Sequence, residues 1–555
     1  MRRALARLRA TQKGARGFAA LQSPAPSSEN GVGLAPRAMA RNLQLWHEYD
    51  FGGHTWNKFR GDAFQWVFLS GPAAIILGAS SMPSLAEDVS IESSSTDGTN
   101  IADSGGLRKI EDGSVVSNEH TSKWRIFTDN GRNYFMQGNV EQAEKFFRSA
   151  LEEAREGFGE RDPHVASACN NLAELFRLKK DFESAEPLYL EAINILEKHF
   201  GIDDIRVGAA LHNLGQFYLI QRILEKARVC YERALKIKRR VLGEAHPEYA
   251  DTLYHLGTVL HLQGKEKDAE DLIVDSIRIL DAIGQGESFL CVRRMQYLAQ
   301  MYIKSNRFTE AEILLRKILH TMELSKGWKS FDTVVAAERL ALVLQISGEL
   351  REAEDLLERC LDARKKLLPD EHIQNAANML YTARLKMQIS NQLMRTKSSQ
   401  AMAELDVAKD LLQKCIRVAR HVLVQVVEQK GNKGPTGIPR KTRNEAHSAA
   451  LILLQSLNAL GSLEIMKLEF PGAMEYLPAE AEAEAALCQC VSTYKEFASE
   501  HSISDSPQVK AEYLSCLRHL YNLVSKGMTS EIGTAKEIKD EIRRVEDEVS
   551  KAAGV

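Results

Sequence analysis

Alanine recurs at every 42nd position through the middle of this chain. The six positions are Ala143, Ala185, Ala227, Ala269, Ala311 and Ala353. Twelve residues before each alanine stands another small residue, at Gly131, Ala173, Gly215, Gly257, Ala299 and Ala341. A sequence period of about 20 to 50 residues is the signature of a stacked repeat protein. Any fold for this chain must therefore repeat one structural unit at this fixed step.

The spacing inside each unit predicts a pair of helices joined by a short turn. Turn-forming pairs such as Gly138-Asn139 and Gly264-Lys265 lie between the small residue and the alanine. Small side chains let two helices approach closely, and an aromatic residue such as Tyr134 fills the space beside them. One such hairpin cannot bury its apolar face alone, so neighbouring hairpins must stack on each other.

Helix-boundary residues follow the same step. Pro163 and Pro247 stand where a first helix begins, a position that proline tolerates. Glycines stand where second helices end, at Gly159, Gly201, Gly243 and Gly327. The chain has only 14 prolines and 7% aromatic residues, which favours helices over a β-sandwich.

Two stretches carry a family resemblance. They are Asn170-Asn171-Leu172-Ala173, running to Ala185-Glu186-Pro187-Leu188-Tyr189, and Leu242-Gly243-Glu244-Ala245-His246-Pro247. They resemble the tetratricopeptide repeat in its 42-residue form, found in kinesin light chains and nephrocystin-3-like proteins. The resemblance covers six repeats over residues 121–365. It implies an all-α fold, a right-handed α-solenoid of tetratricopeptide helix hairpins, seven or eight in number.

The register changes after Cys360. Ala408 to Cys415 resembles Ala353 to Cys360 but lies further along the chain than one repeat step. This excess predicts an insertion of thirteen positions within 391–403. We therefore expect a seventh repeat with an insertion over 366–428. A Gly/Pro-rich basic loop follows at 429–444, for which a solvated linker and a contact with acidic lipid or a partner are the alternatives.

The remaining residues, 445–555, are predicted to hold a degenerate repeat and C-terminal capping helices. Gly461 and Ala473 again stand twelve residues apart, as in the regular repeats. Apolar residues near the C-terminus follow helical spacing, at Ile538, Ile542, Val545 and Val549. We interpret this last helix as the cap of the solenoid, with a partner-binding helix as the alternative.

The N-terminal segment is predicted to be a targeting sequence. Residues 1–86 hold ten Lys and Arg against four Asp and Glu. An arginine-rich, acid-poor start with an apolar helical face is typical of a mitochondrial presequence, which we assign to 1–60. A chloroplast transit peptide is the alternative, and residues 87–120 are expected to be a disordered linker.

An uncharged stretch from Ala63 to Ala86 lies within the apolar segment 61–86. It is long enough to cross a bilayer, for which about 20 residues suffice. Three interpretations remain open. It can be an inner-membrane anchor, a cleaved sorting signal for the intermembrane space, or an inert part of the leader.

No enzyme motif is found. The sequence lacks a Walker-type loop, a G-x-G-x-x-G after a strand, an H-E-x-x-H and a G-x-S-x-G. No cofactor, small-molecule substrate or metal is expected, since His255 and His261 do not share a helix face and His47, Asp50 and His54 lie in the leader. The eight cysteines include no C-x-x-C pair and are expected to be small buried residues. A net charge of −3 argues against nucleic-acid binding.

The predicted binding surface is a groove lined by the first helix of each hairpin. The candidates there are Asn170, Asn171, His212, Asn213, Gln216, Tyr254, His255 and Tyr297. Asparagine and glutamine both donate and accept hydrogen bonds, so they suit a peptide backbone of any sequence. The resemblance implies that Asn171 and Asn213 hold a cargo peptide. The alternative is that such asparagines tie adjacent helices together.

These observations favour a non-enzymatic interaction scaffold that binds a peptide or partner helix in an organelle and aids complex assembly. The alternative is a cytosolic cargo adaptor like the kinesin light chain. Light chains carry long heptads before their repeats, and residues 87–120 have none. A third class, an enzyme with a repeat domain, would need a catalytic module outside the repeats.

Overall fold

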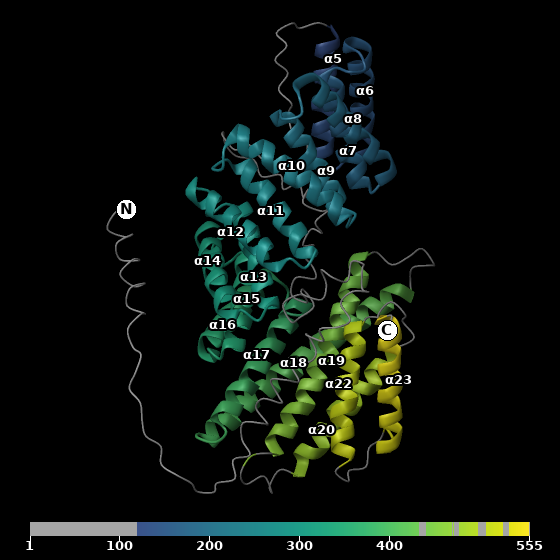
Figure 1. The fold of residues 1–555 in the computed structure, drawn as a ribbon. Coiled ribbons are helices and arrows are strands. Elements are labelled where there is room, and N and C mark those ends of the chain that lie inside the picture. Colours follow the sequence, from purple (N-terminus) through teal and green to yellow (C-terminus); the bar gives the residue numbers. More distant parts are fainter. Residues whose placement is uncertain are drawn as a thin grey trace, which may run out of the picture. The chain divides into compact units, whose positions relative to one another are not determined.

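The computed structural model describes residues 119–431, 440–468, 470, 477–497, 507–525 and 532–553. Every regular element within these ranges is an α-helix (Figure 1). The expected presequence, the apolar segment from Ala63 to Ala86 and the linker all lie outside the described residues. So do residues 432–439 of the basic loop.

Twelve helices form six hairpins at the predicted step. The first helices are α5 (Glu119–Met136), α7 (Pro163–Lys179), α9 (Ile205–Ile220), α11 (Pro247–Leu262), α13 (Phe289–Lys304) and α15 (Phe331–Ser347). The second helices are α6 (Val140–Phe158), α8 (Phe182–Phe200), α10 (Leu224–Leu242), α12 (Glu266–Ala282), α14 (Phe308–Lys326) and α16 (Leu350–Leu367). Each helix packs on the one before it and the one after it, which confirms the all-α hairpin fold (Figure 1).

Six capping side chains, each one repeat step after the last, start the first helices from α7 to α15 and the first helix of the next hairpin. They are Asp162, Asp204, His246, Ser288, Ser330 and His372, and each accepts a hydrogen bond from a backbone N–H in the first turn. Such caps satisfy donors that a helix start leaves without an intrahelical partner. The prolines pointed to two of these starts, and the other four became visible only in the structure.

The turn inside each hairpin has one residue with left-handed backbone. This residue also recurs at the repeat step, at Gly138, Lys180, Arg222, Gly264, Asn306 and Gly348, with φ between 57° and 92°. The predicted glycine caps are confirmed at the ends of α6, α8, α10 and α14, where φ is also positive. Glycine adopts this conformation without the strain that a Cβ causes.

The small residue of the first helix permits close contact with the second helix of the same hairpin. A Cβ on Gly131 would lie 2.6 Å from the ring of Phe147, and one on Gly215 would lie 2.9 Å from the ring of Tyr231. In both hairpins the contacted ring lies one helical turn after the repeated alanine. The regular spacing of the small residue and the alanine therefore marks the place in each hairpin where the two helices pack most closely.

The seventh hairpin consists of α17 (Ile373–Leu393) and α18 (Ser398–Gly431). Helix α17 starts one repeat step after α15, but α18 starts six positions later than one step after α16, and these six positions are the insertion. The insertion lengthens the end of α17 and the turn. Ala401, the fourth residue of α18 and fully buried, therefore matches Ala353, the fourth residue of α16. Our alignment of Ala408 with Ala353, and the insertion of thirteen positions that it predicted, are wrong by two helical turns, because helical packing nearly repeats at that shift.

The chain continues in α19 (Arg440–Leu468), α20 (Leu477–Phe497), α22 (Pro507–Val524) and α23 (Ala535–Ala553). A Cβ on Gly461 of α19 would lie 2.7 Å from Leu487 of α20, so these helices form an eighth hairpin. The predicted partner Ala473 lies outside the described residues. Ala483, four residues before Leu487 and fully buried, holds the place of the repeated alanine.

The last helix, α23, packs on α22 through the buried side chains of Ile538 and Val545. Ile542 is partly buried at the same contact, and the side chain of Val549 lies outside the described residues. The helical spacing in the sequence thus corresponds to a packed face, with charged residues on the other side of the helix.

A disulfide joins Cys490 of α20 to Cys516 of α22. Both residues are fully buried, as predicted for the cysteines, but the sequence did not predict that this pair is bonded. The other six are free and buried. The two bonded residues lie on adjacent helices and are separated by 26 positions. Such a pairing depends on how the helices pack, so the local spacing of cysteines in the sequence does not predict it.

Among the described residues, Ala446–Leu468 of α19 is long and apolar enough to cross a membrane. Its most apolar window is 78% buried inside the protein. Packing on α18, α20 and α22 accounts for this burial, as in the central helix of a bundle.

The glycine contact predicts the effect of Gly257→Val. A Cβ at this position would lie 2.8 Å from Ile273 and 3.1 Å from the backbone oxygen of Ala269, which cannot move aside cheaply. We expect a loss of about 1–3 kcal/mol in stability from overpacking, measured by urea unfolding followed by circular dichroism. Lys267→Val, at an exposed site on α12, is the control and should change little. Equal stability of the two variants would contradict the contact.

Candidate functional site

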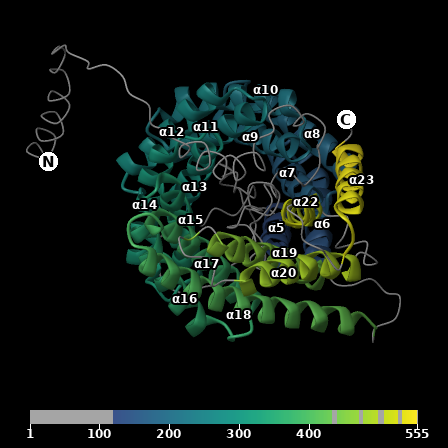
Figure 2. The ribbon, with the colours of Figure 1, turned by 90° about the horizontal axis from the view of Figure 1, so that it is seen from below.

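The first helices of neighbouring hairpins lie side by side and touch through residues 43 positions apart, one more than the repeat step. The Nδ2 of Asn213 on α9 donates to Oδ1 of Asn170 on α7 at 3.1 Å. The rings of Tyr254 on α11 and Tyr297 on α13 meet edge to face at 5.8 Å. We call the surface that carries the eight predicted groove residues on α7, α9, α11 and α13 the first-helix face. Figure 2 shows α9, α13 and α15 on one side of the stack and α10, α14 and α16 on the other.

The predicted groove residues divide by burial and bonding. Asn170, Asn213, His212 and His255 are buried, whereas Gln216, Tyr254 and Tyr297 are half-buried. The bond between Asn170 and Asn213 links two hairpins, which is the helix-tying role that the sequence left open for such asparagines.

Asn171 differs from these two asparagines. Its side chain is 1% exposed, and neither its Nδ2 nor its Oδ1 has a hydrogen-bond partner in the described structure. A buried amide without partners costs about 1–3 kcal/mol per group. Asn171 is therefore the predicted groove residue whose bonding capacity the protein leaves unused.

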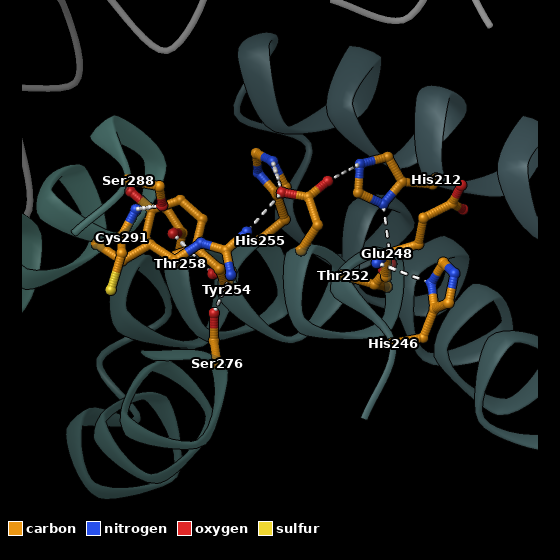
Figure 3. Close-up of polar contacts among 12 residues, drawn as sticks. His212, His246, Glu248, Thr252, Tyr254, His255, Thr258, Ser276, Ser288 and Cys291 are labelled. Carbon is orange, nitrogen blue, oxygen red and sulfur yellow. Dashed lines mark hydrogen bonds and ion pairs between the residues drawn. The ribbon is translucent and has the colours of Figure 1, made fainter. Parts of the chain in front are cut away.

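A cluster of charged and aromatic side chains lies between α9 and α13 (Figure 3). Asp251 on α11 is its centre, and one of its oxygens, Oδ1, lies 3.0 Å from Nη2 of Arg294. The other oxygen, Oδ2, lies 3.3 Å from Nε2 of His212, and Nε2 of His255 lies 3.7 Å from Oδ1. The second guanidinium nitrogen of Arg294, Nη1, donates to the hydroxyl of Ser276 at 2.6 Å.

The surroundings of Asp251 fix its charge. Burial raises the pKa of this carboxyl, but the cationic forms of His255 and His212, with Arg294 and Lys238, lower it by more. The net result holds the pKa of Asp251 well below its usual range, so the group is ionised at neutral pH.

Sequence reasoning named His212 and His255 but missed Asp251 and Arg294. It compared His255 only with His261, on the same helix. The signal was nonetheless present, because Asp251 and Arg294 are 43 residues apart, as are Asn170 and Asn213. Writing the repeats under one another and comparing adjacent rows would have brought these side chains together.

The cluster contains a hydroxyl next to a histidine, in Thr252 and His212. The two atoms, Oγ1 and Nδ1, are 3.1 Å apart. Thr252 is fully buried, however, and its hydroxyl donates to the backbone oxygen of Glu248 at 3.0 Å. This hydroxyl is not placed to attack a substrate, so the cluster is suited to binding and not to nucleophilic catalysis.

Two cationic side chains further along the first helices are largely removed from water. Burial lowers the pKa of Lys304, at the end of α13, to about 8, and the nearby charge of Arg222 adds to this. Burial likewise lowers the pKa of Arg339 on α15 to about 10, with a partial offset from Glu338. Both groups remain charged at pH 7.

Comparison with known proteins now assigns the repeat. Residues 125–198, 206–282 and 333–374 match profiles of the tetratricopeptide repeat. These segments are tetratricopeptide repeats. The match includes α7, α9 and α11 of the first-helix face, whereas α13 lies between the matched segments. No curated protein sequence matches the chain significantly.

Three solved structures illustrate the likeness to known folds. The tetratricopeptide-like repeats of a Podosopora anserina protein described as a kinesin light chain are 19% identical, with a TM-score of 0.35, covering 38% of this chain and 99% of theirs. BtubC from P. vanneervenii is 17% identical, with a TM-score of 0.34 and coverage of 45% and 93%. The quorum sensor NprR from B. thuringiensis is 12% identical, with a TM-score of 0.40 and coverage of 77% and 98%. These are likenesses of fold alone.

The lowered pKa of Lys304 predicts how stability depends on pH. Because its folded pKa of about 8 lies below the usual 10.5, the unfolded chain binds more protons between these values. The destabilisation is fully present below pH 8 and disappears as the pH rises towards 10.5. We expect Lys304→Met to melt at a higher temperature than the native protein at pH 7, with the difference shrinking by pH 10.

Thermal melts across this pH range measure the effect. Lys267→Met, at an exposed position on α12, is the control and should follow the native protein at every pH. A constant difference between Lys304→Met and the native protein from pH 7 to 10 would contradict the assignment.

Proposed function

We propose that this protein is a non-enzymatic scaffold that binds an extended peptide or a partner helix along the first-helix face. The observation that carries the proposal is the amide of Asn171, which is buried in that face without a partner. A peptide backbone supplies one donor and one acceptor per residue, which are the two groups that this amide lacks. Because the amide is buried, the Asn171 side chain must turn towards the surface when the peptide binds.

The surroundings of Asn171 support the same role. Its neighbour Asn170 is fixed by Asn213, so this part of the face is pre-organised and loses little entropy on binding. The half-buried side chains of Gln216, Tyr254 and Tyr297 continue the face over α9, α11 and α13. Tyrosines offer large contact area at low entropy cost, which suits a binding surface.

We further propose that the scaffold works in mitochondria, tethered to the inner membrane, and aids assembly of a complex there. Support comes from the amino-acid composition alone. Residues 1–60 are rich in arginine and poor in acids, and the uncharged stretch from Ala63 to Ala86 follows.

Because Asn171 and Asn213 differ in hydrogen bonding, we expect different results from replacing them. Asn171→Ala removes an amide that has no partner in the described structure, and the relief of that cost offsets the small cavity it leaves. Stability should therefore stay near normal while peptide binding weakens at least tenfold. Asn213→Ala leaves the buried oxygen of Asn170 without this donor, so it should cost about 1–3 kcal/mol of stability. Asn194→Ala, exposed on α8, is the control for both measurements.

Peptides selected from a displayed library against the full chain provide the binding probe, and fluorescence anisotropy gives their Kd. Thermal melting reports the stability of each variant. Undiminished binding by Asn171→Ala, with binding by Asn194→Ala also unchanged, would reject the role of the first-helix face.

A fusion of residues 1–60 to a fluorescent reporter tests the proposed location. We expect the reporter to enter mitochondria, because a cationic amphipathic segment is drawn inward by the membrane potential. Replacing Arg2, Arg3, Arg7 and Arg9 by glutamine should abolish import. A diffuse or microtubule-bound signal from the native fusion would instead favour the cytosolic adaptor, and a plastid signal would favour the chloroplast.

A further inference from the structure

We propose that His212, Asp251 and His255 form a binding site for a divalent transition-metal ion such as Zn²⁺ on the first-helix face. Each residue offers one ligand atom, and these atoms all lie within 4.8 Å of one another. Figure 3 labels the two histidines, His212 and His255. Two imidazole nitrogens and one carboxylate oxygen are a ligand set that suits Zn²⁺ and its neighbours in the first transition series. Magnesium and calcium prefer oxygen ligands, so they are the wrong class of ion for this site.

The spacing of the ligand atoms fits one ion. Two ligands held by Zn²⁺ at about 2.0–2.1 Å in tetrahedral geometry lie roughly 3.4 Å apart. Nε2 of His212 is 3.3 Å from Oδ2 of Asp251, and Nε2 of His255 is 3.7 Å from the other oxygen of that carboxylate, Oδ1. All the ligand atoms lie within 4.8 Å of one another, so small side-chain movements bring them around one ion. Asp251 and His255 are four residues apart on α11 and therefore share a helix face. The pair meets His212 across the junction of two hairpins.

Hydrogen bonds behind His212 orient it as a ligand. The hydroxyl of Thr252 has a single hydrogen, which it donates to the backbone oxygen of Glu248. Nδ1 of His212 must then donate to Oγ1 of Thr252, which leaves a lone pair on Nε2 of the neutral ring. That lone pair faces Oδ2 of Asp251, so two acceptors oppose each other unless a cation lies between them. A buried partner behind a histidine is also the usual outer contact of a metal ligand.

Arg294 orients the carboxylate from the other side. It is fully buried, is anchored on Ser276, and holds Oδ1 of Asp251 at 3.0 Å. Oδ2 is thereby turned towards His212. The guanidinium also competes with an incoming cation for the charge of Asp251, so we expect binding of micromolar and not picomolar strength.

The three ligand side chains are each partly in contact with solvent. The side chain of Asp251 is 16% exposed, and those of His212 and His255 are 6% and 10% exposed. Three protein ligands leave a fourth position for water or for a group brought by a partner. The site goes beyond the proposed peptide binding and does not depend on it, since the metal ligands are complete without a peptide.

The experiment uses the full chain without a histidine tag, after dialysis against a chelator. Zn²⁺ is titrated calorimetrically, and Co²⁺ replaces it for absorption spectra that report nitrogen and oxygen ligation. We expect one ion per chain, a rise in melting temperature with Zn²⁺, and visible absorption bands with Co²⁺. His212→Gln, His255→Gln and Asp251→Asn should each weaken binding at least tenfold.

His246→Asn is the matched control. His246 is also close to the cluster, but its Nδ1 caps α11 by accepting from the N–H of Glu248, and asparagine can replace it there. This variant should bind Zn²⁺ like the native protein. Melting without metal shows whether each variant is folded.

Absence of saturable binding by the native chain would overturn the proposal and would leave a proton as the cation between His212 and Asp251. Equal affinity in folded His212→Gln and His255→Gln would overturn it too. Neither result bears on peptide binding, which Asn171→Ala tests separately.

Discussion

The close contact of two helices at one small residue determines the rest of this structure. At Gly131, Gly215 and Gly257 the space for a Cβ is already filled by the second helix. That contact sets how deeply the two helices of a hairpin approach each other, and the repeat step carries it from hairpin to hairpin. A capping side chain and a left-handed turn residue stand at equivalent positions in successive units, so successive first helices start in the same way.

Regular stacking also brings the first helices of adjacent hairpins side by side. Residues separated by 43 positions become neighbours, so side chains from different repeats build one polar surface. Some of these contacts hold the stack together, such as Asn170 with Asn213 and Gln345 with Gln388. Others leave bonding capacity unused, as at Asn171, or bring ligand-type atoms together, as at His212, Asp251 and His255. Binding function in this protein thus depends on the junctions between repeats.

The sequence was sufficient to predict the hairpins, because glycine and alanine at the close contacts tolerate few replacements and therefore mark the period. It was less reliable after Cys360. A shift of two helical turns preserves the helical spacing of small and apolar residues there, so Ala408 resembles Ala353 as well as Ala401 does. It did not predict the bond between Cys490 and Cys516 or the cluster around Asp251. These features join residues on different helices, and their distances depend on packing that no local motif encodes.

Cross-linking of the first helices tests most directly whether the repeats form one stack in which residues 43 positions apart, on adjacent first helices, meet. Tyr254→Cys combined with Tyr297→Cys places two thiols on rings that now meet at 5.8 Å, and the six native free cysteines are buried. We predict rapid intramolecular cross-linking of this pair by a short bis-maleimide in the native protein. Tyr254→Cys with Arg339→Cys, one repeat further along, should not react. Equal yields for both pairs, or none for the first, would contradict the stacked register and the binding surface that depends on it.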